Sequence, residues 1–140
     1  MDAIAQITWI TVLAAAIAGY VVGAVWYGAL GDRWLAAIGK TKADISDENG
    51  RPKTYVPFVL AFLADIVMAI ILSGIIYHAG EVTIRAGLIS AFLVWAGFVL
   101  TTLTVNTAFS MRSWSLIWID GGHWLFVLLV MGGVIGALGL

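Results

Sequence analysis

The sequence contains no cysteine and few charged residues. Because cysteine is absent from all 140 residues, disulfides, thiolate metal ligands and cysteine nucleophiles are excluded. Charged residues make up 11% of the chain, whereas about 25% is usual in soluble domains. A net charge of −1 provides no basic surface, so no nucleic-acid partner is expected. With so little polar surface to show to water, the chain is expected to have the lipid bilayer as its solvent.

Long apolar runs are what the sequence does contain. Hydrophobic residues make up 62% of it, and the mean hydropathy is +1.04. A helix needs about 20 apolar residues to cross a bilayer, and four runs reach that length. They occupy about 7–30, 56–77, 86–109 and 114–138. We therefore expect one all-α domain, residues 1–140, that forms a polytopic membrane protein with four transmembrane helices.

Lysine and arginine are distributed unequally among the expected loops. The loop at 31–55 and the turn with Arg112 lie on one side of the membrane and hold all of these residues except Arg85. Since basic loops stay in the cytoplasm, we expect the 31–55 loop to be cytoplasmic and both termini to lie outside, in a bacterial inner membrane. The first six residues contain no basic residue, and the apolar run after them is too long for a signal peptide. We interpret that run as a retained span.

The loop at 31–55 has two helix signals. Asp32 is a plausible N-cap for a short helix that lies on the cytoplasmic membrane surface. Its apolar residues fall on one face and are Trp34, Leu35 and Ile38. Thr41 and Asp44 have the spacing of a capping box, which predicts a second short helix.

Small residues recur at four-residue spacing in the first and fourth spans. Ala15, Gly19 and Gly23 form one ridge, and Gly132 and Gly136 form another. Such ridges let helix backbones approach closely in lipid. Ala15 and Gly19 lie at the depth of the second ridge, which predicts that these two helices touch, within one chain or between chains. A homodimer or another homo-oligomer is therefore expected.

The third span has two polar stripes at helical spacing. The first stripe is interpreted as a seam for helix packing. It consists of Ser90, Gly97, Thr101, Thr104 and Ala108. The second stripe contains Trp95, Val99, Thr102, Asn106 and Phe109. Threonine hydroxyls can bond back to their own helix, so the threonines of both stripes need no function.

Polar side chains gather in the cytoplasmic half of the expected membrane region. Asp120 and His123 are three residues apart and lie on one helix face. A carboxylate and an imidazole there could bind a cation or relay protons; the alternative is a local pair that satisfies itself and fixes packing. Trp26 and Tyr27 are either interfacial anchors or part of the site. The candidate ligand- or proton-binding residues are Asp65, Asp120, His123, Asn106, Thr102, Trp26 and Tyr27.

No recognisable catalytic motif accompanies this set of residues. Serine nucleophile elbows, phosphate loops and paired catalytic acids are missing from the sequence. One histidine with two aspartates is a poor basis for a metal site. We expect no catalytic residues, no cofactor and no bound metal.

Several short motifs resemble a known family. The stretch 26–30, WYGAL, is followed by Trp34 and Gly39 and resembles the first-helix signature of the family catalogued as domain of unknown function 1761. Its third and fourth helices resemble Gly97-Phe98, Thr101-Thr102, Asn106 and then 116–119, LIWI, running into Gly122. The resemblance implies four spans and no established activity. It also implies asparagine and tyrosine at the positions of Asp120 and His123, which would make the ionisable pair a specialisation of this chain.

Three functions are compatible with these features. The first is a small oligomeric transporter or binder of a cationic or protonatable small molecule, with Asp65, Asp120 and His123 carrying the charge. The second is an accessory or structural subunit packed against a larger membrane protein complex. The third, an intramembrane enzyme acting on a lipid or quinone, rests only on the acid and the imidazole.

Overall fold

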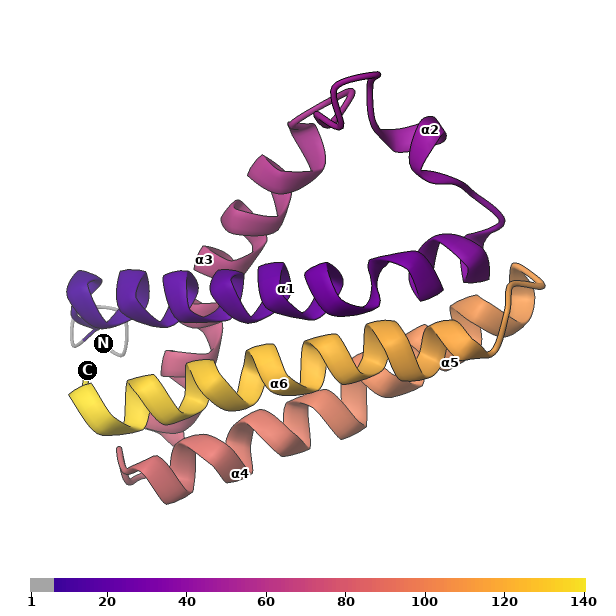
Figure 1. Cartoon of the computed structure of the whole chain (residues 1–140). Coiled ribbons are helices and arrows are strands. Elements are labelled where there is room, and N and C mark those ends of the chain that lie inside the picture. Colours follow the sequence, from indigo (N-terminus) through magenta and orange to yellow (C-terminus); the bar gives the residue numbers. More distant parts are fainter. Residues whose placement is uncertain (1–6) are drawn as a thin grey trace.

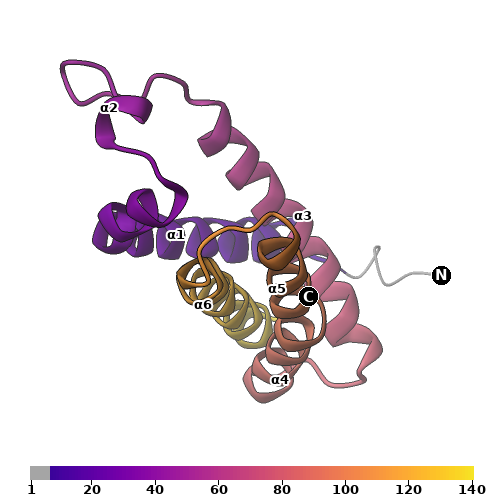
Figure 2. The same ribbon diagram turned by 90° about the vertical axis from the view of Figure 1, so that its right-hand side faces the viewer.

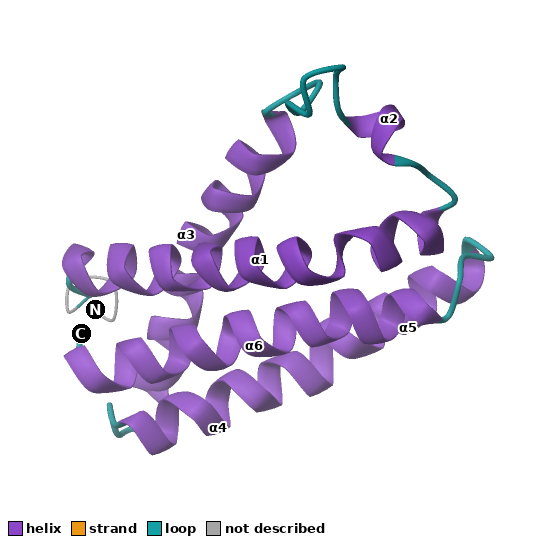
Figure 3. Cartoon of the chain, in the orientation of Figure 1, coloured by secondary structure: helices purple, strands orange, loops and turns teal. Residues whose placement is uncertain are grey.

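The computed structural model describes residues 7–140, and all of the regular structure in this range is helical (Figure 3). The first six residues, whose lack of a basic residue speaks against a signal peptide, lie outside the described range. Four helices of the described range, with α4, η1 and α5 forming one of them, are long and apolar enough to cross a membrane. The prediction of an all-α polytopic membrane protein is confirmed. The elements are α1 (Trp9–Ile38), α2 (Lys42–Ile45), α3 (Val56–His78), α4 (Ile84–Val94), η1 (Trp95–Val99), α5 (Leu100–Phe109) and α6 (Ser115–Leu138).

Three of the long helices run side by side and the other crosses them. In Figure 1, α1, α6 and the continuous α4–η1–α5 helix lie along a common direction, while α3 crosses behind α1 and α6 at a steep angle. Figure 2 looks roughly along that direction and shows α3 running across the view. We call the end where α1 ends and α5 turns into α6 the loop end. The opposite end, where α1 begins and α6 ends, is the terminal end.

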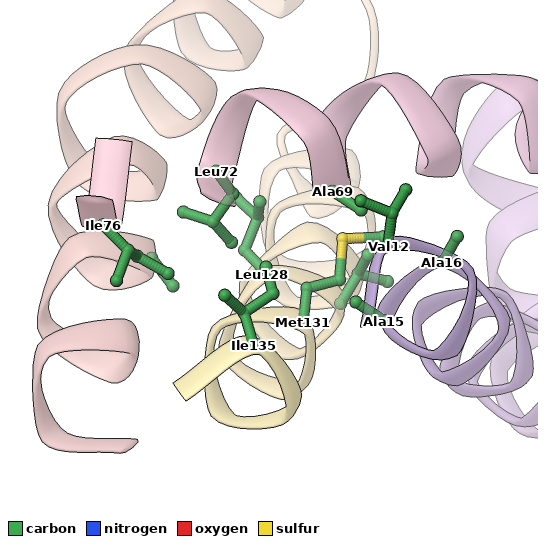
Figure 4. Close-up of a cluster of buried hydrophobic side chains, with 11 residues drawn as sticks. Val12, Ala15, Ala16, Ala69, Leu72, Ile76, Leu128, Met131 and Ile135 are labelled. Carbon is green, nitrogen blue, oxygen red and sulfur yellow. The ribbon is translucent and has the colours of Figure 1, made fainter. Parts of the chain in front are cut away.

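The hydrophobic core lies where α3 crosses α1 and α6 (Figure 4). On α1 the buried side chains are small, so α3 and α6 approach it closely and fill the space with larger ones. The labelled core residues are Val12, Ala15, Ala16, Ala69, Leu72, Ile76, Leu128, Met131 and Ile135. The outer faces are apolar as well: Val21, Leu63 and Phe98 are all exposed. Helices that are apolar on every face suit a membrane, where lipid replaces water around the fold.

Both glycine ridges pack against other helices of the same chain. Gly19 packs against Met131 of α6, which confirms the expected contact between the first and fourth spans. Gly132 and Gly136 face α4 instead of α1, because the backbone of Gly87 lies against Gly132 and that of Thr83 lies against Gly136. Depth alone could not distinguish these two neighbours of α6. Any homo-oligomer would therefore have to use a face other than these ridges.

A π-helical turn, η1, interrupts the third span at Trp95–Val99. A π turn is wider than an α turn and shifts the register of the residues that follow it. Before η1, the helix buries Ser90, as the expected seam requires; Gly97 within η1 and Thr101 after it are exposed, and Thr107 is buried instead. The predicted seam is thus wrong at Gly97, Thr101 and Ala108, which are exposed, because it assumed one uninterrupted α-helical period. The Thr101 hydroxyl donates back to the Gly97 carbonyl at 2.9 Å, as expected for a threonine without a partner.

The loop after the first span is shorter than predicted. Residues 31–38 are helical, but they continue α1 instead of forming a separate surface helix that begins at Asp32. The helix stops only at Gly39, whose φ of 70° closes it in the left-handed conformation that glycine tolerates. The second predicted helix exists as α2, where the Asp44 carboxylate accepts hydrogen bonds from the backbone N–H (2.7 Å) and the hydroxyl (3.0 Å) of Thr41.

Removing the Thr41 hydroxyl is expected to raise the pKa of Asp44. That pKa lies below its usual value because the Thr41 N–H and hydroxyl donate to the carboxylate. A depressed pKa stabilises the folded linker at pH values above the unfolded pKa, and this stabilisation is lost as the pH falls through the folded value. A carboxyl titration of Thr41→Ala by nuclear magnetic resonance should move the midpoint toward the ordinary aspartate value. Thr54→Ala, a similar change elsewhere in the linker, should leave it unchanged.

Gly87→Ala is expected to destabilise the bundle by about 1–3 kcal/mol, because the new methyl group would overlap the Gly132 carbonyl. Gly74→Ala is the matched control: apart from its own stretch of helix, nothing lies within 4 Å of its added Cβ, and alanine is favoured over glycine in a helix by about 0.5–1 kcal/mol. Thermal unfolding in detergent measures both variants. Equal midpoints would contradict the close α4–α6 contact.

Candidate functional site

A hydrogen bond between α1 and α6 brings two predicted residues together. The Tyr27 hydroxyl donates to Oδ1 of Asp120 at 2.6 Å. A separation of 2.5–2.7 Å is typical of an O–H group donating to an ionised carboxylate, and such bonds are roughly twice as strong as neutral ones. Tyr27 and Asp120 are each half-buried. The carboxylate is therefore oriented by one donor without being closed off from the surface of the bundle.

Two tryptophans hold the backbone of α6 on either side of Asp120. The indole Nε1 of Trp26 donates to the Ile119 carbonyl at 2.9 Å, and that of Trp95 donates to the Gly121 carbonyl at 2.8 Å. The two rings come from different helices, α1 and η1. An added Cβ at Gly122 would lie 2.8 Å from the Trp26 ring, so glycine is needed there for the ring to reach its acceptor. The helix that carries Asp120 is thus fixed from both sides.

His123 lies one turn further along α6 and is 7% exposed. Its ring packs against Tyr27 and Trp124, with centroid separations of 4.8 and 4.5 Å. It also lies against α1, where a Cβ added to Gly23 would be 3.0 Å from its Nε2. The Nδ1 atom is buried and has no hydrogen-bond partner among the described residues. A buried polar atom without a partner is uncommon and requires an explanation such as a bound molecule.

The structure brings together some of the predicted site residues and leaves others apart. Four of them form one cluster, which we call the polar cluster; it consists of Trp26, Tyr27, Asp120 and His123. Thr102 and Asn106 are exposed on α5, and neither side chain bonds to Asp120 or His123. Asp65 is buried on α3 and makes no hydrogen bond to the cluster. Across residues 7–140, no three His, Asp or Glu side chains are placed to hold a metal ion.

Trp95 is a contributor that lies outside the predicted site. Its only sequence signal is an indole N–H deep in an apolar span, where a donor needs an acceptor within the protein. The acceptor, the Gly121 carbonyl, could not be identified without the π turn that sets the direction of the ring.

A family model described as protein of unknown function (DUF1761) matches residues 10–136. The chain belongs to the DUF1761 family. The match covers every residue of the polar cluster and all four long helices apart from the first residue of α1 and the last two of α6. No curated protein and no solved structure matches the chain. Membership of the DUF1761 family therefore brings no activity with it, and a function has to be argued from the cluster.

Trp95→Phe is expected to lower the free energy of unfolding by about 0.5–1.5 kcal/mol, because it keeps an aromatic ring but removes the donor to the Gly121 carbonyl. Trp26→Phe should behave in the same way. Trp118→Phe is the matched control, since Trp118 is 80% exposed and donates no hydrogen bond in the described chain. Unfolding midpoints in detergent decide the matter; a loss no larger than that of Trp118→Phe would show that the indole bonds contribute nothing.

Proposed function

We propose that the protein binds a cationic or protonatable small molecule at Asp120 and carries it across the membrane as a small transporter. The observation that carries this proposal is the Tyr27–Asp120 hydrogen bond of 2.6 Å, which holds an acidic side chain in place within a membrane-spanning bundle. Ionisable residues within membrane spans are rare and mark ion and substrate pathways, so such a residue is a functional-site hypothesis by default.

Among residues 7–140, Asp120 has no cationic partner. In the part of the chain that is described, the one ion pair is between Lys42 and Asp32, at the loop end. Asp120 has no basic partner, and its second oxygen accepts no hydrogen bond. A cation about 4 Å from a carboxylate is attracted by about 4 kcal/mol at an effective dielectric constant of 20. A ligand with one positive charge therefore suits this site better than a neutral or anionic one.

Aromatic rings around the carboxylate add to this preference. Tyr27 packs against Trp34 on one side, with a centroid separation of 5.9 Å, and against His123 on the other. Ring faces attract cations, most strongly where water is excluded. The unpartnered Nδ1 of His123 supplies one more polar contact, which can accept a hydrogen bond from an ammonium group.

Asp120→Asn is expected to weaken the binding of tetraphenylphosphonium, a permanent lipophilic cation, by about tenfold or more, since each factor of ten corresponds to about 1.4 kcal/mol. Equilibrium dialysis of the purified protein in mild detergent measures the affinity. Asp32→Asn removes the same charge from an exposed position at the loop end and should bind the probe as the unchanged protein does.

Equal affinities for Asp120→Asn and the unchanged protein would sink the proposal. The alternative is then an accessory subunit of a larger membrane complex, and native mass spectrometry of the protein extracted from its own membrane would show a partner of fixed stoichiometry. A homo-oligomer alone would support a self-contained transporter.

We further propose a bacterial inner-membrane location, with residues 39–55 in the cytoplasm, on the basis of the basic residues in that loop.

A further inference from the structure

Asp65 is a buried acid that the polar cluster does not use. It lies on α3 and is 4% exposed. Within residues 7–140, its carboxyl group takes part in no hydrogen bond and no ion pair. It is also the first buried residue of α3, because Val56–Ala64 are all exposed or half-buried. The acid therefore marks the point at which α3, followed from its first residue, becomes buried in the bundle.

The neighbouring contacts of α3 place Asp65 against α1. One turn earlier, Phe62 packs edge-on against Tyr20 of α1, with ring centroids 5.5 Å apart. One turn later, Ala69 belongs to the same core cluster as Val12 and Ala16 of α1 (Figure 4). Residues three and four apart share a helix face. Asp65 thus faces the small-residue side of α1 between these two contacts.

No charged group of the surrounding helices compensates Asp65. On α1, the titratable side chain at this level is Tyr20, whose ring is occupied by Phe62. On α6, His123 packs against Tyr27, Trp124 and Gly23. On α4, Arg85 is exposed at the terminal end. None of these three groups is bonded to the carboxyl group of Asp65.

Among residues 7–140, an ionised carboxylate in this position would have neither a hydrogen-bond donor nor a cation to stabilise it. Buried acids without a partner take up a proton instead, because the neutral form avoids most of the desolvation penalty. We propose that Asp65 is a proton-binding site, separate from the cation site at Asp120, and that it carries an exchangeable proton at neutral pH. The two intramembrane acids of the chain then differ in their surroundings: Asp120 accepts a hydrogen bond from Tyr27, whereas Asp65 has no partner among residues 7–140.

Exchange of this proton is favoured by the place of Asp65 at the edge of the bundle. Leu63 and Ala64, directly before it, are exposed, so the carboxyl group lies within one turn of the outer surface. Release of the proton would leave a charge between α1 and α3, and water or a cation would have to enter there. Proton binding at Asp65 is therefore coupled to the packing of α3 on α1.

Infrared spectroscopy of protein labelled with ¹³C-carboxyl aspartate tests this proposal directly. At pH 7, in a detergent without ester groups, we expect the C=O stretching band of a protonated carboxylic acid. The band should persist in Asp120→Asn, disappear in Asp65→Asn, and shift to lower frequency after transfer to D₂O. Asp65→Asn has nearly the shape of the neutral acid and is expected to fold.

Absence of the band from Asp120→Asn at pH 7 would overturn the proposal, even if Asp65→Asn could not be purified, because a protonated Asp65 would have to contribute to it. A band that never shifts in D₂O would also overturn it, since a binding site must exchange its proton. The result is independent of the proposed function: tetraphenylphosphonium binding depends on Asp120, and the infrared band depends on Asp65.

Discussion

The contact between α1 and α6 is the constraint on which the rest of the structure depends. A membrane offers no water to polar groups, so each donor and acceptor needs a partner from the protein. Gly19 and Gly23 let α6 come close to α1, and this proximity lets Tyr27 reach Asp120. A larger residue at Gly23 would meet the imidazole of His123 first. The close approach of the α1 and α6 backbones and the pairing of Tyr27 with Asp120 therefore depend on the same glycines.

The same requirement explains the unusual form of the third span. Trp95 reaches the carbonyl of Gly121 from a π turn, and the helix beyond that turn presents Leu100 and Leu103 to Gly121. An uninterrupted α-helix would keep its earlier face toward α6. The π turn lets one helix pack against α6 through two different faces, first through Gly87 and then through the leucines. Such turns occur often at functional sites, and this one holds the backbone beside Asp120.

Much of the fold follows from the sequence because it depends on local properties. The four spans are a matter of length and hydropathy, and the capping of α2 is a matter of residue spacing. The features that could not be predicted depend on the direction in which each helix face points. Gly132 faces α4 instead of α1, and Thr102 points outward, because neighbour choice and the π turn lie outside any periodic pattern. For the site, residue type identified Asp120 and His123, and depth suggested Tyr27, but the isolation of Asp65 required the crossing of α3.

The steep crossing of α3 also constrains how the protein sits in a bilayer (Figure 2). With its 30 residues, α1 is about 45 Å long, and with its 23 residues α3 is about 34 Å long; the hydrocarbon core to be matched is about 30 Å thick. If α1 stood upright, it would be too long for that core, while a strongly inclined α3 would be too short. A bundle axis inclined to the membrane normal shortens the projection of α1 and lengthens that of α3. The hydrophobic thickness of the protein is therefore set by the angle between two of its helices, and a membrane of different thickness would act on that angle first.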